Sequence, residues 1–200
     1  MPAVESETYR IAGIGEADLT LLQTWLADEQ LARGLNIAAR RYSEEEVRRY
    51  ASSFDGRNSI LVGIYTSDPR TLIGIATFDA NPRHRTASWT LVIGDRRHRK
   101  EATVMGVCVT LFDWAFTTAK FEKISSRVAA HKLVLIHLLE RVGVPREGYL
   151  RSEILSADGL RRHDEVLHGL LRGEWPEVRR VAMERRAKAL LREQAAIGLR

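Results

Sequence analysis

A basic stretch at 95–103 stands where a phosphate-bearing ligand could bind. Its four cationic side chains are Arg96, Arg97, Arg99 and Lys100. An apolar run at 86–94 predicts a strand before the stretch, and apolar residues at helical spacing predict a helix over 103–120 after it. The first turn of a helix presents N–H groups without intrahelical partners and the positive end of the helix dipole. The junction therefore predicts binding of phosphate groups, carried either by a small ligand or by nucleic acid.

The composition is that of a globular protein of ordinary size. The chain has 200 residues, of which 44% are apolar and 28% charged, and this length predicts one domain with an appendage at most. Lysine and arginine total 31 against 26 acidic residues, a net charge of +5. A modest positive excess suits an acidic ligand without identifying it.

The cysteine and histidine residues form no metal-binding pattern. A single cysteine, Cys108, excludes a disulfide framework and any multi-cysteine zinc or iron–sulfur site. The six histidines include no His-Glu-x-x-His or similar spacing, so we expect no metal. No apolar run reaches the roughly 18 residues of a membrane span, and residues 1–10 lack the apolar core of a signal peptide. We therefore expect a cytoplasmic protein with no membrane attachment.

Hydrophobic periodicity and turn signals divide the chain into strands and helices. Strands are expected at 8–14, 59–66, 71–78, 86–94, 123–130, 147–155 and 163–171. Helices are expected after a cap at Asp18, behind a Ser43–Glu46 capping box, and over 103–120, 133–142 and 176–197. The segment 33–42 is expected to be a loop.

This order predicts an α/β fold with a mixed sheet and helices on both faces. Three consecutive strands lead into a helix and then into a crossover strand. Cys108 lies within the apolar stripe of that helix, so we expect it to be buried. Arginine and glutamate interleave along 176–197, which favours a helix packed on the domain or on a second subunit. Contact with nucleic acid is the alternative for this helix.

Several motifs resemble the GNAT-fold N-acetyltransferases, in particular the branch that acetylates ribosomal-protein N-termini (the RimJ/RimL type). The first is Ile93-Gly94-Asp95-Arg96-Arg97-His98-Arg99-Lys100-Glu101-Ala102-Thr103-Val104, with Phe112-Asp113-Trp114-Ala115-Phe116 after it. The others lie at 138–144, 146–151, 158–159, 163–166 and 170–175. The resemblance covers roughly 9–175 and implies a mostly antiparallel GNAT-like sheet. We therefore expect an acyltransferase domain over 1–175 and a basic helical extension over 176–200.

The resemblance implies a binding turn for acetyl-CoA or another acyl-CoA. The family turn reads Arg/Gln-x-x-Gly-x-Gly/Ala, and its positions fall here on Arg99, Ala102 and Val104. Both positions that are small in the family therefore carry larger residues in this chain. The donor phosphates would be held by Arg97, Arg99, Lys100 and the backbone amides of Ala102, Thr103 and Val104. The family's Asn and Ser at the start of the next helix are replaced by Lys132 and Leu135.

The resemblance also points to two residues for proton transfer. Ser88 stands where the family often carries a glutamate base, and Leu139 replaces a tyrosine acid of other branches. His131 ends the crossover strand, where the family's sheet opens to admit the acyl group. Ser88 and His131 are therefore the candidate catalytic residues.

The resemblance therefore implies an N-acyltransferase that acts by direct attack of an amine on the donor. The acceptor would be a primary amine of a small molecule or of a protein N-terminus, entering near 33–42 and the Asp158-Gly159 turn. One alternative keeps the fold and takes an aminoacyl-tRNA as donor, because the turn and the tail are basic. Another is a binding protein without turnover, because the family's Glu and Asn are missing. Relatives of this type also make a homodimer possible.

Overall fold

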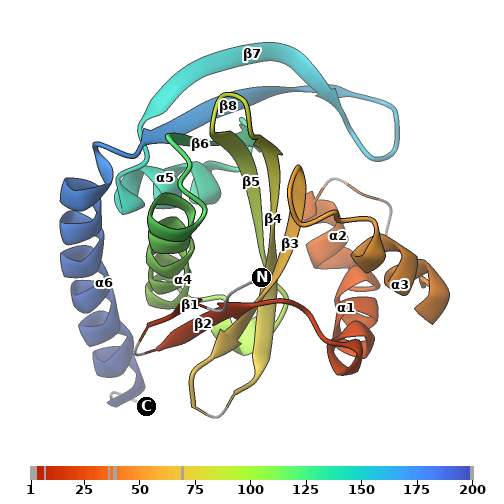
Figure 1. Ribbon diagram of the computed structural model, residues 1–200, viewed down its shortest axis with the longest axis horizontal. Helices are drawn as coiled ribbons and strands as arrows, with labels where there is room; N and C mark the ends of the chain where they lie inside the picture. Colours follow the sequence, from red (N-terminus) through yellow and green to blue (C-terminus); the bar gives the residue numbers. More distant parts are fainter. Residues whose placement is uncertain (1–3, 7, 36, 38–39, 69, 199–200) are drawn as a thin grey trace.

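A mixed sheet forms the centre of the molecule (Figure 1). The computed structural model describes residues 4–6, 8–35, 37, 40–68 and 70–198. Within them eight strands follow the order β1-β2-β3-β4-β5-β6-β8-β7, antiparallel except where β5 meets β6. The strands are β1 (Val4–Glu5), β2 (Tyr9–Ala12), β3 (Ser59–Thr66), β4 (Leu72–Asn81), β5 (Thr86–Ile93), β6 (Lys123–Ala129), β7 (Arg146–Leu155) and β8 (Arg162–Leu171). The expected mostly antiparallel α/β sheet is confirmed.

Helices cover both faces of this sheet: α1, α2 and α3 lie on one face, and α4, α5 and α6 on the other (Figure 1). They are α1 (Leu19–Leu26), α2 (Glu29–Leu35), α3 (Glu44–Ser52), α4 (Glu101–Asp113), α5 (Leu133–Val142) and α6 (Trp175–Gly198). In the described part of the chain, no helix has both the length and the apolar character needed to cross a membrane.

The larger core lies between the sheet and α4. Phe112 stands at its centre, with the rings of Trp89 and Trp175 edge-on at centroid distances of 4.9 and 5.5 Å. Cys108 is buried in the same layer, as expected, and burial raises the pKa of its thiol to about 12. Cys108 therefore packs as a small apolar residue rather than reacting as a thiolate.

The pairing between β5 and β6 ends early. Only Thr86–Ser88 pair with Lys123–Ser125, although β5 continues to Ile93 and β6 to Ala129. Beyond Ser125, β6 pairs with β8 alone among the described strands. The sheet thus opens between the second half of β5 and the second half of β6.

Local signals fix two of the helix ends as predicted. The Ser43 hydroxyl accepts the N–H of Glu46, and the Glu46 carboxylate accepts the N–H of Ser43, so the capping box is confirmed. Gly143 ends α5 in the left-handed conformation with φ 101°, a region that favours glycine. The helix expected at 103–120 is α4 followed by a π-helical turn, Trp114–Thr118.

Two local expectations are wrong. Asp18 makes no side-chain cap bond to α1, because its carboxylate accepts from the Gly15 N–H and the Tyr65 hydroxyl at 2.9 and 2.7 Å. The segment expected as a loop begins inside α2, which extends to Leu35; positions 36, 38 and 39 lie outside the described residues. Packing of the buried Leu31 and Ala32 stabilises a helix that the glycine at 34 argues against.

The terminal helix α6 packs along α4 and α5. The indole N–H of Trp175 donates to the Asp113 carboxylate at 2.9 Å, and the Arg179 guanidinium donates to the same carboxylate at 2.9 and 3.0 Å. Gly106 permits a close approach, since a Cβ there would lie 2.6 Å from both Arg186 and the Tyr9 ring. α6 is therefore continuous with the core of the domain.

We expect Gly94→Ala to destabilise the fold. An added Cβ at this position would overlap the ring of the buried Trp25, which α1 holds in place. Overpacking of this kind costs about 1–3 kcal/mol, measured as the free energy of unfolding in urea. Gly13→Ala is the matched control, because a Cβ there meets nothing within 4 Å. Equal stability of the two variants would contradict this packing.

Candidate functional site

The candidate site surrounds the opening between β5 and β6. Side chains alternate along β5, so Ala87 and Trp89 are buried toward α4 while Ser88 and Thr90 are exposed on the face that carries α1–α3. Ser88 lies opposite Ser125 in the last parallel pair and opposite Asp79 of β4. It therefore marks the point where the opening begins.

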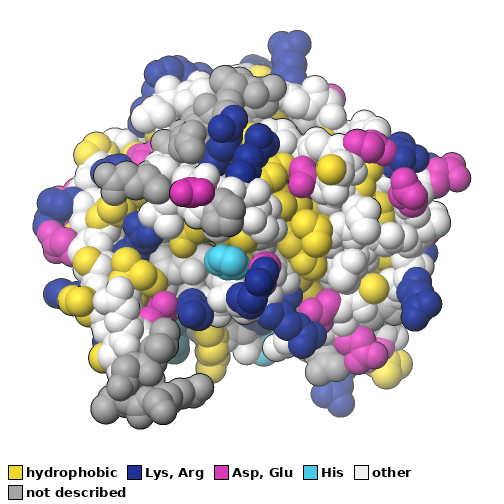
Figure 2. Space-filling view, turned by 90° about the horizontal axis from the view of Figure 1, so that it is seen from below, with side chains coloured by type: hydrophobic (Ala, Val, Ile, Leu, Met, Phe, Trp, Pro, Cys, Tyr) yellow, Lys and Arg dark blue, Asp and Glu magenta, His cyan; other side chains and the backbone are white. Residues whose placement is uncertain are grey.

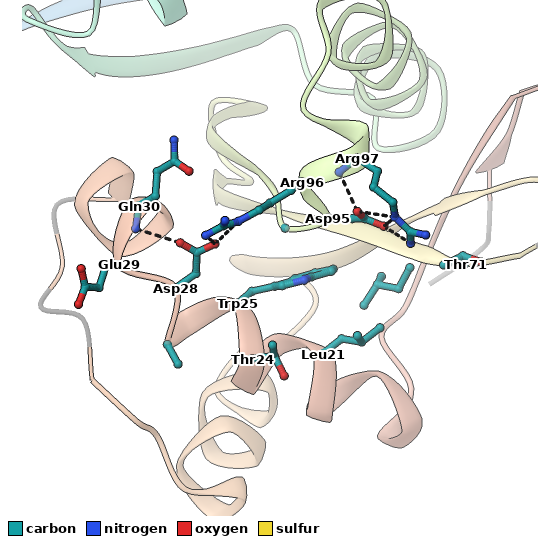
Figure 3. A pocket seen from close by; sticks show the side chains of 13 residues that line it. Leu21, Thr24, Trp25, Asp28, Glu29, Gln30, Thr71, Asp95, Arg96 and Arg97 are labelled. Atoms are coloured by element: carbon teal, nitrogen blue, oxygen red, sulfur yellow. Dashed lines mark hydrogen bonds and ion pairs between the residues drawn. The ribbon is translucent and has the colours of Figure 1, made fainter.

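The basic turn after β5 is organised by Asp95. Its carboxylate accepts the backbone N–H of Arg97 at 2.9 Å and the Arg97 guanidinium at 2.7 Å (Figure 3). The same carboxylate lies 3.3 Å from the His98 ring. The hydrogen bonds from Arg97 lower the pKa of Asp95 to about 2. The carboxylate is therefore ionised at neutral pH and neutralises part of the charge of the turn.

Asp28, between α1 and α2, neutralises another part of the turn. Arg96 donates to its carboxylate at 3.1 Å (Figure 3). Arg99 reaches the same carboxylate at 3.5 Å. Burial works against ionisation, but hydrogen bonds from the Leu31 N–H and from Arg96 outweigh it and lower the pKa of Asp28.

The arginines of the turn point in different directions. Arg99 folds inward and donates to the carbonyls of Ile93 and Gly94, both at 2.9 Å, so that 24% of its side chain stays exposed. Arg97 is 79% exposed, and Lys100 is exposed at the N-cap of α4. Arg99 therefore links the start of α4 to the open end of β5, while Arg96, Arg97 and Lys100 remain exposed to solvent.

The first turn of α4 already holds an anion. The N–H of Ala102 donates to the carboxylate of Glu193 on α6 at 3.1 Å, while the N–H of Val104 bonds to the carbonyl of Lys100 at 3.0 Å. Thr103 is buried. The Glu193 carboxylate has the position and the charge that a phosphate takes at a helix N-terminus. The turn thus suits an anion, and a residue of the chain's own terminal helix supplies one.

A hollow of about 430 Å³, lined in part by titratable side chains, lies on the other side of the opening. It is lined by Ile37, by His131 and Lys132 after β6, and by Asp158 and His163 of the β7–β8 hairpin. The rings of His131 and His163 are 4.5 Å apart. Residue 37 and the Asp158 turn come from the two segments expected to admit the acceptor, and both contribute to the hollow that contains His131.

His131 is held in its neutral form near pH 7. Partial burial, the neighbouring His163 and the cation of Lys132 all lower its pKa below the ordinary histidine value. A neutral imidazole beside the opening can accept a proton. Ser88 is not among the residues that line this hollow. The two candidate catalytic residues therefore occupy different parts of the opening.

Sequence reasoning missed three features of the site. Glu193 and His163 act through contacts with segments far from them in the chain, and no local pattern indicates those contacts. Thr90 was detectable, because it shares the strand face of Ser88 by simple alternation.

The fold has many counterparts among solved structures. Spermidine N-acetyltransferase from Vibrio cholerae, in a structure described as a complex with CoA and spermine, superposes with a TM-score of 0.75 at 18% identity over 85% of this chain and 99% of that chain. An acetyltransferase of the GNAT family from Bacillus anthracis superposes with a TM-score of 0.73 at 16% identity. This match covers 86% of this chain and 100% of that chain. The chain has the GNAT fold. No family model matches its sequence, and no curated protein matches it either.

We expect NMR titration to find the pKa of His131 below that of an ordinary histidine. In His163→Ala the pKa of His131 should rise, because the variant removes a like charge and some of the burial. His84→Ala, at the exposed β4–β5 turn, should leave it unchanged. A pKa of His131 that stays the same in His163→Ala would show that the two rings are not coupled.

Proposed function

We propose that this protein is an N-acyltransferase that transfers an acyl group from an acyl-CoA to a primary amine. The observation that carries the proposal is the opening between β5 and β6. An anion-binding helix N-terminus begins at one side of it, and the hollow that contains neutral His131 lies at the other. The GNAT fold and the solved relative described with CoA and spermine support this assignment.

The donor would lie at the start of α4, with its phosphates near Lys100, Arg97 and the N-terminal amides. Bound acyl-CoA supplies the thioester that the amine attacks. The helix N-terminus fits an anion, but the amide of Ala102 is engaged by Glu193. Donor binding therefore requires that carboxylate to leave. By the sequence motifs, acetyl is the favoured acyl group, and those motifs resemble the branch that acetylates ribosomal-protein N-termini.

In this mechanism, the amine nitrogen attacks the thioester carbon directly. A carbon–nitrogen bond forms while the carbon–sulfur bond breaks, the amine proton passes to the His131 imidazole, and the departing sulfur takes up a proton from solvent. Partial burial and the neighbouring His163 and Lys132 disfavour the protonated form of His131, so it returns its proton readily after the transfer. Ser88, exposed at the edge of the opening, is the second candidate for contact with the amine.

An aminoacyl-tRNA donor is the weaker alternative. The cations of α6 are largely engaged within the protein: Arg179 with Asp113, Arg180 with Glu177 and Glu184, and Arg185 with the Glu140 and Arg141 carbonyls. Basic and acidic side chains are interspersed on the face shown in Figure 2. Affinity for a polyanion needs a continuous basic field, which this face lacks.

Binding of acetyl-CoA, measured by isothermal titration, should become at least about tenfold tighter in Glu193→Ala, because a charged competitor for the Ala102 amide is gone. The free energy of unfolding should fall in the same variant, since a contact between α6 and α4 is lost. Glu184→Ala is the control on the same helix and should change neither the affinity nor the stability of α4. Weaker binding in Glu193→Ala would contradict the competition.

His131→Gln should lower kcat for acetyl transfer about 10²-fold or more, with KM for the amine little changed, because the imidazole acts on the proton rather than on binding. Ser88→Ala should cost less than His131→Gln. Steady-state kinetics with a primary amine measure both effects. If the larger loss occurs in Ser88→Ala, the base has been assigned to the wrong residue.

A further inference from the structure

We propose that an apolar chamber beside the opening binds the body of the acceptor, so that the acceptor is an amine with an aromatic or aliphatic side chain rather than a polyamine. This inference rests on the proposed function and specifies its substrate class. It concerns a chamber separate from the hollow that contains His131.

The chamber encloses about 400 Å³ between α1–α3 and the sheet. Its walls are mainly aliphatic and include Leu22, Leu26, Leu35, Val47 and Val92. An apolar cavity of about 150 Å³ already takes a benzene molecule. The chamber therefore has room for a phenyl ring or for a chain of several methylenes.

The position of the chamber connects it to the chemistry. Thr90 and Val92 form part of its floor, and both belong to the half of β5 that no longer pairs with β6. Ile37 lines both the chamber and the hollow that contains His131. A ligand with its apolar part in the chamber can therefore extend its amine past Ile37 toward His131.

The charges on the chamber wall leave nothing for a polycation to pair with. Of its described lining residues, only Arg40 and Glu46 carry charge, and they pair with each other at 2.8 Å. Glu46 also accepts the Ser43 N–H at 2.7 Å, and Arg40 stacks 3.9 Å from the centroid of the Tyr42 ring. Inside the chamber, the further ammonium groups of a polyamine would lie against aliphatic side chains, and Glu46, the carboxylate of the described lining, is already engaged, so burying them is costly.

The inner end of the chamber is closed by packed residues. Leu22 and Val47 are each 1% exposed. Gln23 donates to the Tyr42 carbonyl at 2.7 Å and joins α1 to the segment before α3. The chamber thus has a fixed depth, so affinity should rise with chain length only until the chamber is full.

The first experiment measures acyl transfer from acetyl-CoA to propylamine, hexylamine, phenethylamine and spermine. Each buried methylene should raise kcat/KM about fourfold, so hexylamine should exceed propylamine by roughly 60-fold. Phenethylamine should match hexylamine, and spermine should fall below both. Transfer to spermine equal to that of hexylamine, or no dependence on chain length, would overturn the chamber proposal while leaving the proposed function intact.

A chamber-filling variant locates the effect. Thr90 is exposed and lies on a strand, where phenylalanine is well tolerated, so Thr90→Phe should fold and occupy the chamber. In Thr90→Phe, the higher kcat/KM for hexylamine than for propylamine should disappear. Thr86→Phe, on the same face of β5 and outside the chamber, is the control and should keep the advantage.

Thermal unfolding with phenethylamine as the probe separates failure of this inference from failure of the proposed function. Stabilisation of the unmodified protein and of Thr86→Phe, but not of Thr90→Phe, supports the chamber even if no amine is acylated. In that case only the proposed function would fail. No stabilisation of the unmodified protein at millimolar phenethylamine would overturn the chamber.

Discussion

Parallel pairing between β5 and β6 lasts for only three residues on each strand, and every part of the candidate site depends on where it stops. β6 has β8 as its other neighbour, so it stays in the sheet after it leaves β5. The second half of β5 keeps β4 on one side and presents its other edge to the opening. The edge groups of this half of β5 are not paired with β6. Those other than the Ile93 carbonyl, which accepts from Arg99, are available to a ligand that lies along the strand.

Electrostatics at the start of α4 connect this opening to the far end of the chain. Glu193 lies 91 residues after Ala102, and it reaches the Ala102 amide because Trp175 and Arg179 hold the first turn of α6 against Asp113. One helix N-terminus cannot hold two anions in the same place. Whatever binds there competes with a residue that lies outside the segment resembling the GNAT enzymes.

The two hollows beside the opening differ in chemistry. The one around His131 contains titratable groups, and partial burial together with His163 and Lys132 lowers the pKa of its imidazole. The one under α1–α3 is apolar, and its single ion pair is internally satisfied. An apolar wall beside a proton acceptor favours an uncharged amine over an ammonium group, because burying an unpaired charge is costly. The shared residue Ile37 makes the two hollows parts of one surface.

Sequence by itself determined the features that depend on neighbouring residues. Periodicity and capping predicted α5, the Ser43–Glu46 box, the strand segments from β3 to β8 along the chain and the basic turn before α4, because these patterns involve residues that are close in sequence. Tertiary structure decided the rest. Arg99 turns inward because the Ile93 carbonyl of β5 and the carboxylate of Asp28 accept its guanidinium. Asp18 accepts the Tyr65 hydroxyl instead of capping α1. Such choices depend on partners brought together by folding, and local sequence carries no signal of them.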